Sequence, residues 1–511
     1  MRVNTTSDPR PTTSRLPSAR RIARGALGLL IGLIALLLFG LVVLAPFTTA
    51  IPIGVGLLLI VADGLVLILA LRKMPTFAAK ALTLIGGFAV VVASAIALSQ
   101  VWATTPPIRG PDGNLLPGSI AALEEVELNG SRQWVTIRGQ DRTNPVLLFL
   151  AGGPGGSELP STRLHLGLLE EHFVVVNWDQ PGAGKSYGAV DIDTLTPKRY
   201  LADAHALIEH LRARFEADKI YLMGESWGTI LGIWLVRDYP DLFRAYVGSG
   251  QMVNTTENDR MGYELALRYL SEQGRSDRLR QLRQSGPPPY TEGNLIFTYA
   301  AYLDVLNHYM AQRAPGEGEN HDILIDAIFA PEYGLWDKVN WVRGLIEVFN
   351  AVYPQLADLD LTQQAAELDV PVYFFVGRHD VNAMTSLVER YYAELKAPHK
   401  ELVWFEKSGH TPLYEEPDKW VKTMVSRVLN RFTMKPTRSP IIFRNGQARE
   451  MHYGTSVLLL ARNRSSTTTA ARYGLPGSKP PKYSATEQKT VRRRESVLRP
   501  CTVLRDSSST M

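Results

Sequence analysis

Residues 224–228 read Gly-Glu-Ser-Trp-Gly, and they join an apolar stretch directly to a helical pattern. The apolar stretch, residues 219–223, has the composition of a strand, and no turn signal separates it from the helix. A serine between two glycines at such a junction is typical of a strained strand-to-helix turn, which only small flanking residues tolerate. The motif therefore predicts that the Ser226 hydroxyl is a nucleophile at the open end of a sheet.

Apolar runs alternate with amphipathic segments on both sides of this motif. We expect a helix over 197–218 and strands over residues 134–137, 145–150, 173–178, 219–223, 245–248, 370–377 and 401–405. Continuous apolar runs are typical of strands buried on both faces, and strands separated by helices imply right-handed crossovers. The predicted fold class is α/β, with a mostly parallel sheet, helices on both faces, and a core formed by residues 131–250 and 369–434.

The alternation breaks between the two core segments. Residues 251–368 are helical in pattern, rich in Tyr, Trp and charge, and interrupted by Pro/Gly-rich runs at 285–289 and 315–318. An insertion of this size predicts a helical cap over the open end of the sheet, which would control access to Ser226.

Three apolar stretches precede the α/β part. Residues 25–47 and 81–102 are uncharged, and residues 51–71 carry only Asp63. Each is long enough to cross a hydrocarbon core, which takes about 20 helical residues. Because the connections between them suit only helical hairpins, we expect a three-helix transmembrane region over 25–102, in contact with the lipid bilayer.

The positive charges predict how this region is oriented. Residues 1–24 contain six arginines and one aspartate, the link at 48–50 is uncharged, and the next link carries Arg72, Lys73 and Lys80. Positively charged loops stay on the cytoplasmic side. We therefore expect a cytoplasmic N-terminus and, after three crossings, a catalytic domain on the outer face of the membrane.

The segments outside these regions are a linker and a tail. Residues 103–130 should form the linker and the start of the soluble domain. Residues 435–511 carry 15 Lys and Arg against 4 Asp and Glu, and we expect them to be disordered, as either a polyanion-binding arm or the product of a shifted reading frame. Cys501 is the only cysteine, so no intramolecular disulfide can form, which favours a bacterial cell membrane.

A serine nucleophile needs a base and an acid that orients the base. Asp380 follows the predicted strand 370–377, and His410 follows the strand 401–405, so both should lie at the same end of the sheet as Ser226. The order serine, acid, histidine is the one that this strand-turn-helix arrangement requires. His379 is a rival base, but it would share one tight turn with its own orienting acid.

Two backbone N–H groups must also hold the negative charge that develops on the substrate oxygen. We expect them at Trp227, just after the nucleophile, and at Gly153, in the glycine-rich loop 151–156. That loop lacks the Gly-Lys-Ser/Thr ending of a phosphate-binding loop. We expect no cofactor and no metal ion.

Four motifs together resemble the prolyl aminopeptidases, also called proline iminopeptidases, and related α/β-hydrolases. They lie at residues 152–155, 178–186, 224–228 and 409–410, and the resemblance extends over about 131–432. It implies a triad of Ser226, Asp380 and His410 and release of an N-terminal residue, often proline, from short peptides. The chain departs from the family at Ala151, where a histidine is usual, and at Pro181, where an arginine is usual.

The resemblance also implies that carboxylates of the cap hold the free amine of the substrate. The cap offers Glu317, Glu332 and Glu347 as candidates. The predicted function is that of a membrane-anchored serine hydrolase cleaving an amide or ester through an acyl-enzyme, as a proline iminopeptidase-like enzyme on short peptides. The alternatives are an esterase or lipase-like hydrolase of small or membrane-proximal acyl substrates and a non-catalytic ligand-binding pseudohydrolase. We expect no nucleic acid partner.

Overall fold

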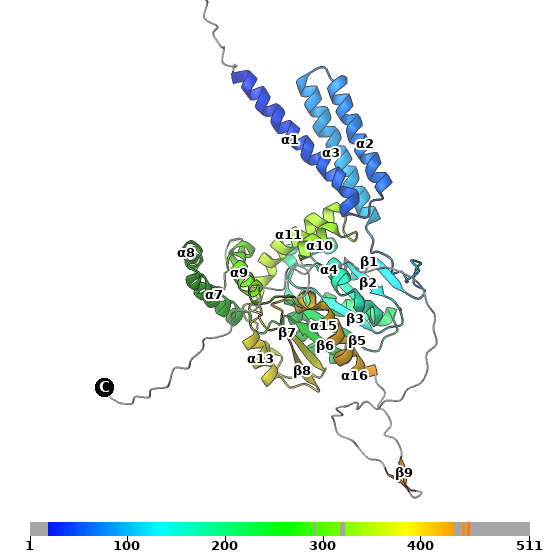
Figure 1. Cartoon of the computed structure of the whole chain (residues 1–511), viewed down its shortest axis with the longest axis vertical. Helices are drawn as coiled ribbons and strands as arrows, with labels where there is room; N and C mark the ends of the chain where they lie inside the picture. The colour runs from blue at the N-terminus through cyan, green and yellow to red at the C-terminus, as the bar shows by residue number, and fades with distance from the viewer. Residues whose placement is uncertain (1–18, 291–292, 317–321, 434–441, 445–446, 450–511) are drawn as a thin grey trace, which may run out of the picture. The chain divides into compact units, whose positions relative to one another are not determined.

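A computed structural model of the chain describes residues 19–290, 293–316, 322–433, 442–444 and 447–449 (Figure 1). The chain divides into two compact units, Met1–Thr437 and Arg438–Met511. In the second unit the described residues form an antiparallel pair of short strands, β9 (Ile442–Arg444) and β10 (Gln447–Arg449). The rest of the predicted tail, and the first part of the predicted cytoplasmic segment, lie outside the described residues.

An eight-stranded sheet forms the centre of the first unit. Its strand order is β1-β2-β4-β3-β5-β6-β7-β8, with antiparallel pairing of β1 with β2 and of β2 with β4 and parallel pairing elsewhere. The strands are β1 (Ile120–Leu128), β2 (Ser131–Gly139), β3 (Val146–Leu150), β4 (Val174–Asp179), β5 (Ile220–Glu225), β6 (Phe243–Ser249), β7 (Val372–Gly377) and β8 (Lys400–Phe405). This sheet confirms the predicted fold class.

The central strands of the sheet are buried on both faces, as the continuous apolar runs predict. In β3, Leu148 and Leu150 belong to one hydrophobic core, whereas Leu147 and Phe149 belong to another. The first core includes side chains of α5 (Pro197–Arg214), α6 (Trp227–Asp238) and α13 (Thr385–Glu394). The second includes side chains of α15 (Pro417–Thr423) and the π-helix η6 (Met424–Leu429).

Several short helices lie between or after the strands of this sheet. They are α4 (Leu159–His165), α14 (Pro412–Glu415), α16 (Asn430–Thr433) and the 3-10 helices η1 (Gly167–Glu171), η2 (Gly184–Ser186), η3 (Ile192–Thr194) and η4 (Pro240–Leu242).

A helical insertion separates β6 from β7, where the sequence predicts a cap. Its elements are α7 (Thr255–Glu272), α8 (Ser276–Ser285), α9 (Leu295–Ala311), α10 (Ile323–Phe329), α11 (Leu335–Val352), η5 (Tyr353–Leu356) and α12 (Leu361–Gln364). α9 packs against both α7 and α11. Tyrosines such as Tyr299 and Tyr302 fill the core between these helices.

Three helices precede the sheet: α1 (Ala19–Thr48), α2 (Ile53–Arg72) and α3 (Phe77–Trp102). Each is long and apolar enough to cross a membrane. Val42, Val91 and Val92 pack between them, but most of their leucines are exposed, and Leu58 is 69% accessible. An exposed surface of this kind fits a membrane anchor, because a soluble protein rarely leaves so large an apolar area open to water.

Candidate active site

Ser226 lies at the junction of β5 and α6 in a strained backbone conformation. Its φ is 49° and its ψ is −117°, a combination that non-glycine residues rarely adopt. The glycines of the motif are required by close approach: a Cβ at Gly224 would lie 2.4 Å from the carbonyl oxygen of Gly228. A Cβ at Gly228 would lie 2.0 Å from the carbonyl oxygen of Leu150. The two glycines therefore allow α6 to pack closely against the end of the sheet, with Ser226 on the turn between β5 and α6.

The structure brings Ser226, Asp380 and His410 together from three separate loops. Nε2 of His410 lies 3.0 Å from Oγ of Ser226, and Nδ1 lies 2.9 Å from Oδ2 of Asp380. The backbone N–H groups of Asn382 and Ala383 each donate to Oδ1 of Asp380 at 2.9 Å, which fixes the carboxylate. This is the geometry of a nucleophile, a base and an orienting acid.

The surroundings of His410 favour its protonated form. Burial opposes the charged imidazolium, but the negative charge of Asp380, the hydrogen bond to it, and the charges of Glu415 and Glu158 together outweigh burial and raise the pKa of His410 above its ordinary value. A base with a raised pKa accepts the serine proton more readily once it is itself neutral.

The rival base, His379, does not line the cavity at Ser226. Its backbone N–H donates to the carbonyl oxygen of Ser408.

Two further carboxyl groups lie beside the base. Glu158 accepts hydrogen bonds from the backbone N–H of Gly152 at 2.8 Å and from the hydroxyl of Tyr414 at 2.5 Å. Burial, together with the charge of Glu158 and a hydrogen bond to it, raises the pKa of Glu225 well above its ordinary value. These surroundings favour the neutral form of the Glu225 carboxyl.

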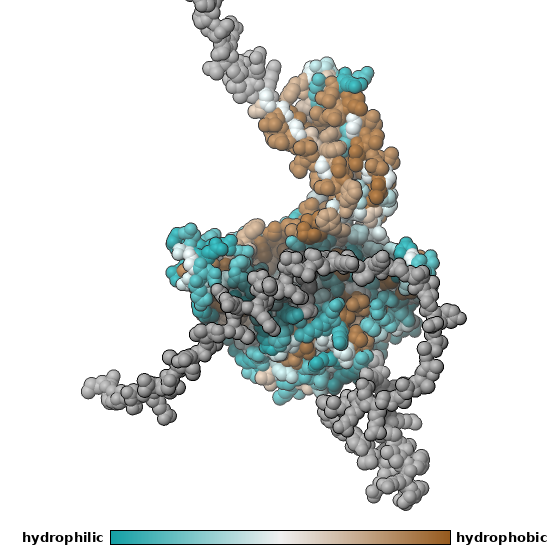
Figure 2. Space-filling model, viewed as in Figure 1, coloured by the Kyte–Doolittle hydropathy of each residue, from teal (hydrophilic) through white to brown (hydrophobic). Residues whose placement is uncertain are grey.

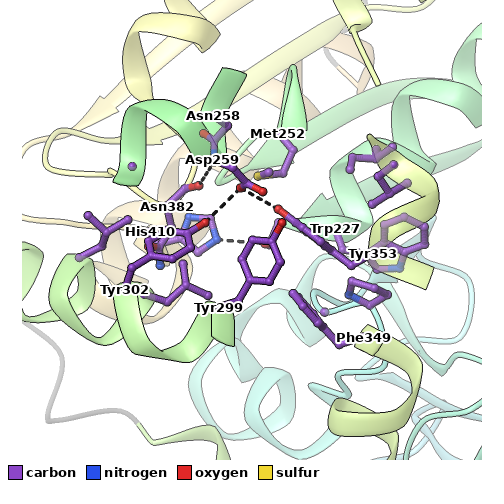
Figure 3. Close-up of a pocket in the computed structure, with 18 residues that line it drawn as sticks. Trp227, Met252, Asn258, Asp259, Tyr299, Tyr302, Phe349, Tyr353, Asn382 and His410 are labelled. Carbon is purple, nitrogen blue, oxygen red and sulfur yellow. Dashed lines mark hydrogen bonds between the residues drawn. The ribbon is translucent and has the colours of Figure 1, made fainter. Parts of the chain in front are cut away.

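A cavity of about 200 Å³ opens at Ser226 (Figure 3). Gly153 and Trp227, the residues predicted to form the oxyanion hole, line it beside Ser226 and His410. The cap supplies much of the remaining wall, which is mainly aromatic and aliphatic: Tyr299, Tyr302, Leu303, Leu306, Phe349, Tyr353 and Leu356. The volume is small for a ligand pocket and suits a single residue or a short acyl group.

One acidic side chain of the cap reaches this cavity. Asp259 of α7 is 3% exposed, and its Oδ1 accepts hydrogen bonds from the hydroxyls of Tyr353 at 2.9 Å and Tyr302 at 3.2 Å (Figure 3). Burial raises the pKa of Asp259 to about 6, although hydrogen bonds from Tyr353, Tyr299 and Tyr302 act in the opposite direction. The tyrosines therefore hold a carboxylate inside a pocket whose wall is mainly aromatic and aliphatic.

Two of the three predicted cap carboxylates, Glu332 and Glu347, do not reach this cavity. Glu332 is fully buried against Arg163, with Oε1 2.6 Å from the guanidinium Nε, and Glu347 accepts a hydrogen bond from Tyr187 and pairs with Arg343 at 3.2 Å. Neither is among the residues that line the cavity. Glu317 lies outside the described residues.

Sequence reasoning missed Asp259, although a weak signal was present. The buried face of α7 includes Thr255, Asp259, Tyr263 and Ala266, at helical spacing. An acidic residue on the buried face of an amphipathic helix needs a partner or a ligand.

Comparisons with known proteins agree with this architecture. Residues 147–423, more than half of the chain, match the Alpha/beta hydrolase family. The chain is 31% identical over 308 residues to "Probable aminopeptidase YbaC" of Bacillus subtilis (strain 168), covering 60% of this chain and 96% of that protein. It is 25% identical over 299 residues to a proline iminopeptidase of Saccharolobus solfataricus, covering 56% of this chain and 85% of that protein.

A similar solved structure is that of a proline iminopeptidase from Mycobacterium smegmatis. It has a TM-score of 0.47 and 18% sequence identity, covering 60% of this chain and 98% of that chain. From the family match and its relatives, the chain belongs to the α/β hydrolase family, and its relatives include proteins named as aminopeptidases.

Proposed function

We propose that this protein is a membrane-anchored serine aminopeptidase that releases one N-terminal residue from short peptides through an acyl-enzyme. The observation that carries the proposal is a single cavity lined by both Ser226 and the buried carboxyl of Asp259. The first would attack the carbonyl of the N-terminal residue, and the second would receive its free amine. The names of the relatives, a probable aminopeptidase and a proline iminopeptidase, support the same reaction class.

The reaction would begin with proton transfer. Nε2 of His410 takes the proton of Ser226 as Oγ attacks the scissile carbonyl carbon, and Asp380 stabilises the resulting imidazolium. The backbone N–H groups of Gly153 and Trp227 hold the oxyanion. His410 then gives its proton to the leaving amine, and water, activated by His410, hydrolyses the acyl-enzyme.

Asp259 would supply the specificity for a free amine. A substrate ammonium that leaves water needs a counter-charge, and a buried carboxylate held by tyrosine hydroxyls provides one. The bound cation in turn favours the ionised form of Asp259. The aromatic walls formed by Tyr299, Phe349 and Tyr353 suit a small apolar or cyclic side chain such as that of proline.

The anchor would be formed by α1, α2 and α3. Their length and exposed apolar surface support three membrane crossings. The positive charges of residues 1–24 and of the second link, with none in the first link, support an outer-face position for the catalytic domain, on the rule that positively charged loops stay inside. Protease treatment of intact cells tests this orientation: digestion of the catalytic domain supports it, and protection contradicts it.

A comparison of substrates and variants tests the enzymatic proposal. With the full-length protein in lipid nanodiscs, we expect hydrolysis of prolyl and alanyl arylamides and none of their N-acetylated forms. Ser226→Ala should abolish turnover and labelling by a fluorophosphonate. Asp259→Asn should reduce kcat/KM for the aminoacyl arylamides by about 100-fold, since breaking a buried ion pair costs about 3 kcal/mol or more.

Asp304→Asn is the matched control, because Asp304 is an exposed cap residue paired with Arg278 outside the cavity. Equal rates on free and N-acetylated substrates would refute the aminopeptidase proposal. Preference for short acyl esters, unaffected by Asp259→Asn, would identify an esterase instead.

A further inference from the structure

In the first three turns of α11, apolar side chains are exposed and polar side chains are buried, which is the reverse of an ordinary surface helix. Trp336, Val339 and Val342 follow one another at three-residue spacing and are 48%, 45% and 41% exposed. On the other side, Asp337 and Asn340 are buried. A helix that faces water normally shows the reverse pattern, with its polar residues outside.

The neighbouring helix α10 extends this apolar surface. Ile325 and Phe329 are 48% and 58% exposed, and α10 packs against α11. Figure 2 shows hydrophobic residues gathered on the surface over α10 and α11. We call the surface formed by Ile325, Phe329, Trp336, Val339 and Val342 the apolar cap face.

The apolar cap face begins where α3 ends. The hydroxyl of Ser99 accepts a hydrogen bond from the backbone N–H of Leu335 at 2.9 Å, and Nε2 of Gln100 donates to Oδ1 of Asp337 at 2.9 Å. Just beyond α3, the backbone N–H of Thr104 donates to the carbonyl oxygen of Pro331 at 3.1 Å. The first turn of α11 is thus bonded to the last turn of α3.

We propose that the apolar cap face lies in the interfacial layer of the same bilayer that holds α1–α3. The inference rests on the proposed membrane anchor, because Ser99 and Gln100 fix the start of α11 at the depth where α3 leaves the hydrocarbon. Apolar side chains at that depth contact lipid, and a tryptophan such as Trp336 is typical of the membrane–water boundary. The burial of Asp337 against protein, where Gln100 and Lys185 donate to its carboxylate, then follows, since lipid could not satisfy it.

This contact would set the position of the catalytic cavity relative to the membrane. α11 runs from Trp336 in the apolar cap face to Phe349 in the cavity wall. At 1.5 Å per residue the two positions are about 20 Å apart along the helix. The cap would therefore be held at two points, by α3 and by lipid, with its substrate pocket close to the membrane surface.

Spin labels at single cysteines test the contact in the full-length protein. With Cys501→Ser as background, labels are placed at Val339→Cys and Val342→Cys, at Leu58→Cys in α2, and at Asp241→Cys, a fully exposed site of the catalytic part. In phosphatidylcholine/phosphatidylglycerol nanodiscs, oxygen collides with labels in lipid, and a water-soluble nickel chelate collides with labels in water. Thermal unfolding and fluorophosphonate labelling confirm that each variant is folded.

We expect the ratio of oxygen to nickel accessibility at positions 339 and 342 to exceed the ratio at position 241 several-fold. If position 58 is in lipid while 339 and 342 match 241, the inference fails and the anchor stands. If position 58 also behaves as an aqueous site, the anchor itself fails. Labels at 339 and 342 that are immobile and shielded from both reagents would show a protein contact, such as a second copy, and would also overturn the inference.

Discussion

A carboxyl oxygen of Glu225 lies 3.8 Å from Nε2 of His410, the same nitrogen that contacts the hydroxyl of Ser226. An ionised group at this distance would compete with the serine for the base. Burial and the neighbouring Glu158 raise the pKa of Glu225 well above its ordinary value, which favours the neutral form of this carboxyl. A neutral Glu225 would place a second acid beside the base without adding a charge to the site.

Glu225→Gln tests this protonation state. Glutamine has the shape and neutrality of the protonated acid, so we expect the acidic limb of the kcat/KM profile to stay where it is in the wild type. If Glu225 were ionised, its loss would remove a negative charge beside His410, lower the pKa of the imidazole and move the limb to lower pH. The measurement is kcat/KM between pH 5 and 9.

Glu415→Gln is the contrasting variant for the same profile. The charge of Glu415 contributes to the raised pKa of His410. Its removal should lower that pKa, and activity should then persist to lower pH than in the wild type. A shift of the acidic limb of the kcat/KM profile in Glu225→Gln, without a shift in Glu415→Gln, would contradict a neutral Glu225 and an ionised Glu415.

Asp259→Asn should stabilise the protein at alkaline pH. Because the pKa of Asp259 is about 6 in the folded state and about 3.9 when unfolded, proton binding favours folding. That contribution is present below about pH 4 and is lost as the pH rises through 6. Two pKa units correspond to about 3 kcal/mol, so the neutral variant gains up to this amount at pH 8.

The apparent melting temperature of full-length protein at pH 4.5 and pH 8 measures this effect. The advantage of Asp259→Asn over wild type should be largest at pH 8 and shrink toward pH 4.5. The exposed Asp304→Asn should show little difference at either pH. An advantage of equal size at both pH values would mean that the carboxylate carries no burial cost.

Two strands that the sequence predicts well are buried on both faces. The runs at 145–150 and 370–377 are continuous and apolar, and they correspond to β3 and β7 within a few residues. β1 was not predicted, because it is a partly exposed edge strand in which Glu124, Glu125 and Glu127 interrupt the apolar pattern. Only pairing with β2 reveals it.

The site residues that follow strands could be predicted from the sequence, whereas the site residue on the cap could not. Ser226, Asp380 and His410 could be placed because each follows a strand, and the ends of parallel strands meet at one edge of the sheet. No such rule applies to the cap, where the position of α7 depends on its packing against α9 and on hydrogen bonds between Asn258 and residues 382 and 384. Asp259 therefore could not be distinguished from Glu332 by residue type alone.

Gly228→Ala should prevent correct packing of α6 against the sheet. The added Cβ would lie 2.0 Å from the carbonyl oxygen of Leu150, and this backbone atom cannot move without distorting β3. We expect destabilisation of about 3 kcal/mol or more, at the upper end of overpacking effects. Gly167→Ala is the control, because a Cβ there meets no atom within 4 Å. Similar yields and melting temperatures for both variants would disprove the close approach.

Glu332→Gln separates a structural role from substrate binding. Glu332 is fully buried and bonded both to Arg163 and to the hydroxyl of Thr105, at 3.0 Å, so it ties the cap to the start of the soluble part. Removing its charge leaves the guanidinium without its counter-charge, and we expect a loss of about 3 kcal/mol in stability. Because neither Glu332 nor Arg163 lines the cavity, KM for aminoacyl arylamides should not change.

Glu347→Gln is the control. It removes one partner of an exposed ion pair and should cost less than about 1 kcal/mol in stability. A raised KM with unchanged stability in Glu332→Gln would return this residue to the substrate site.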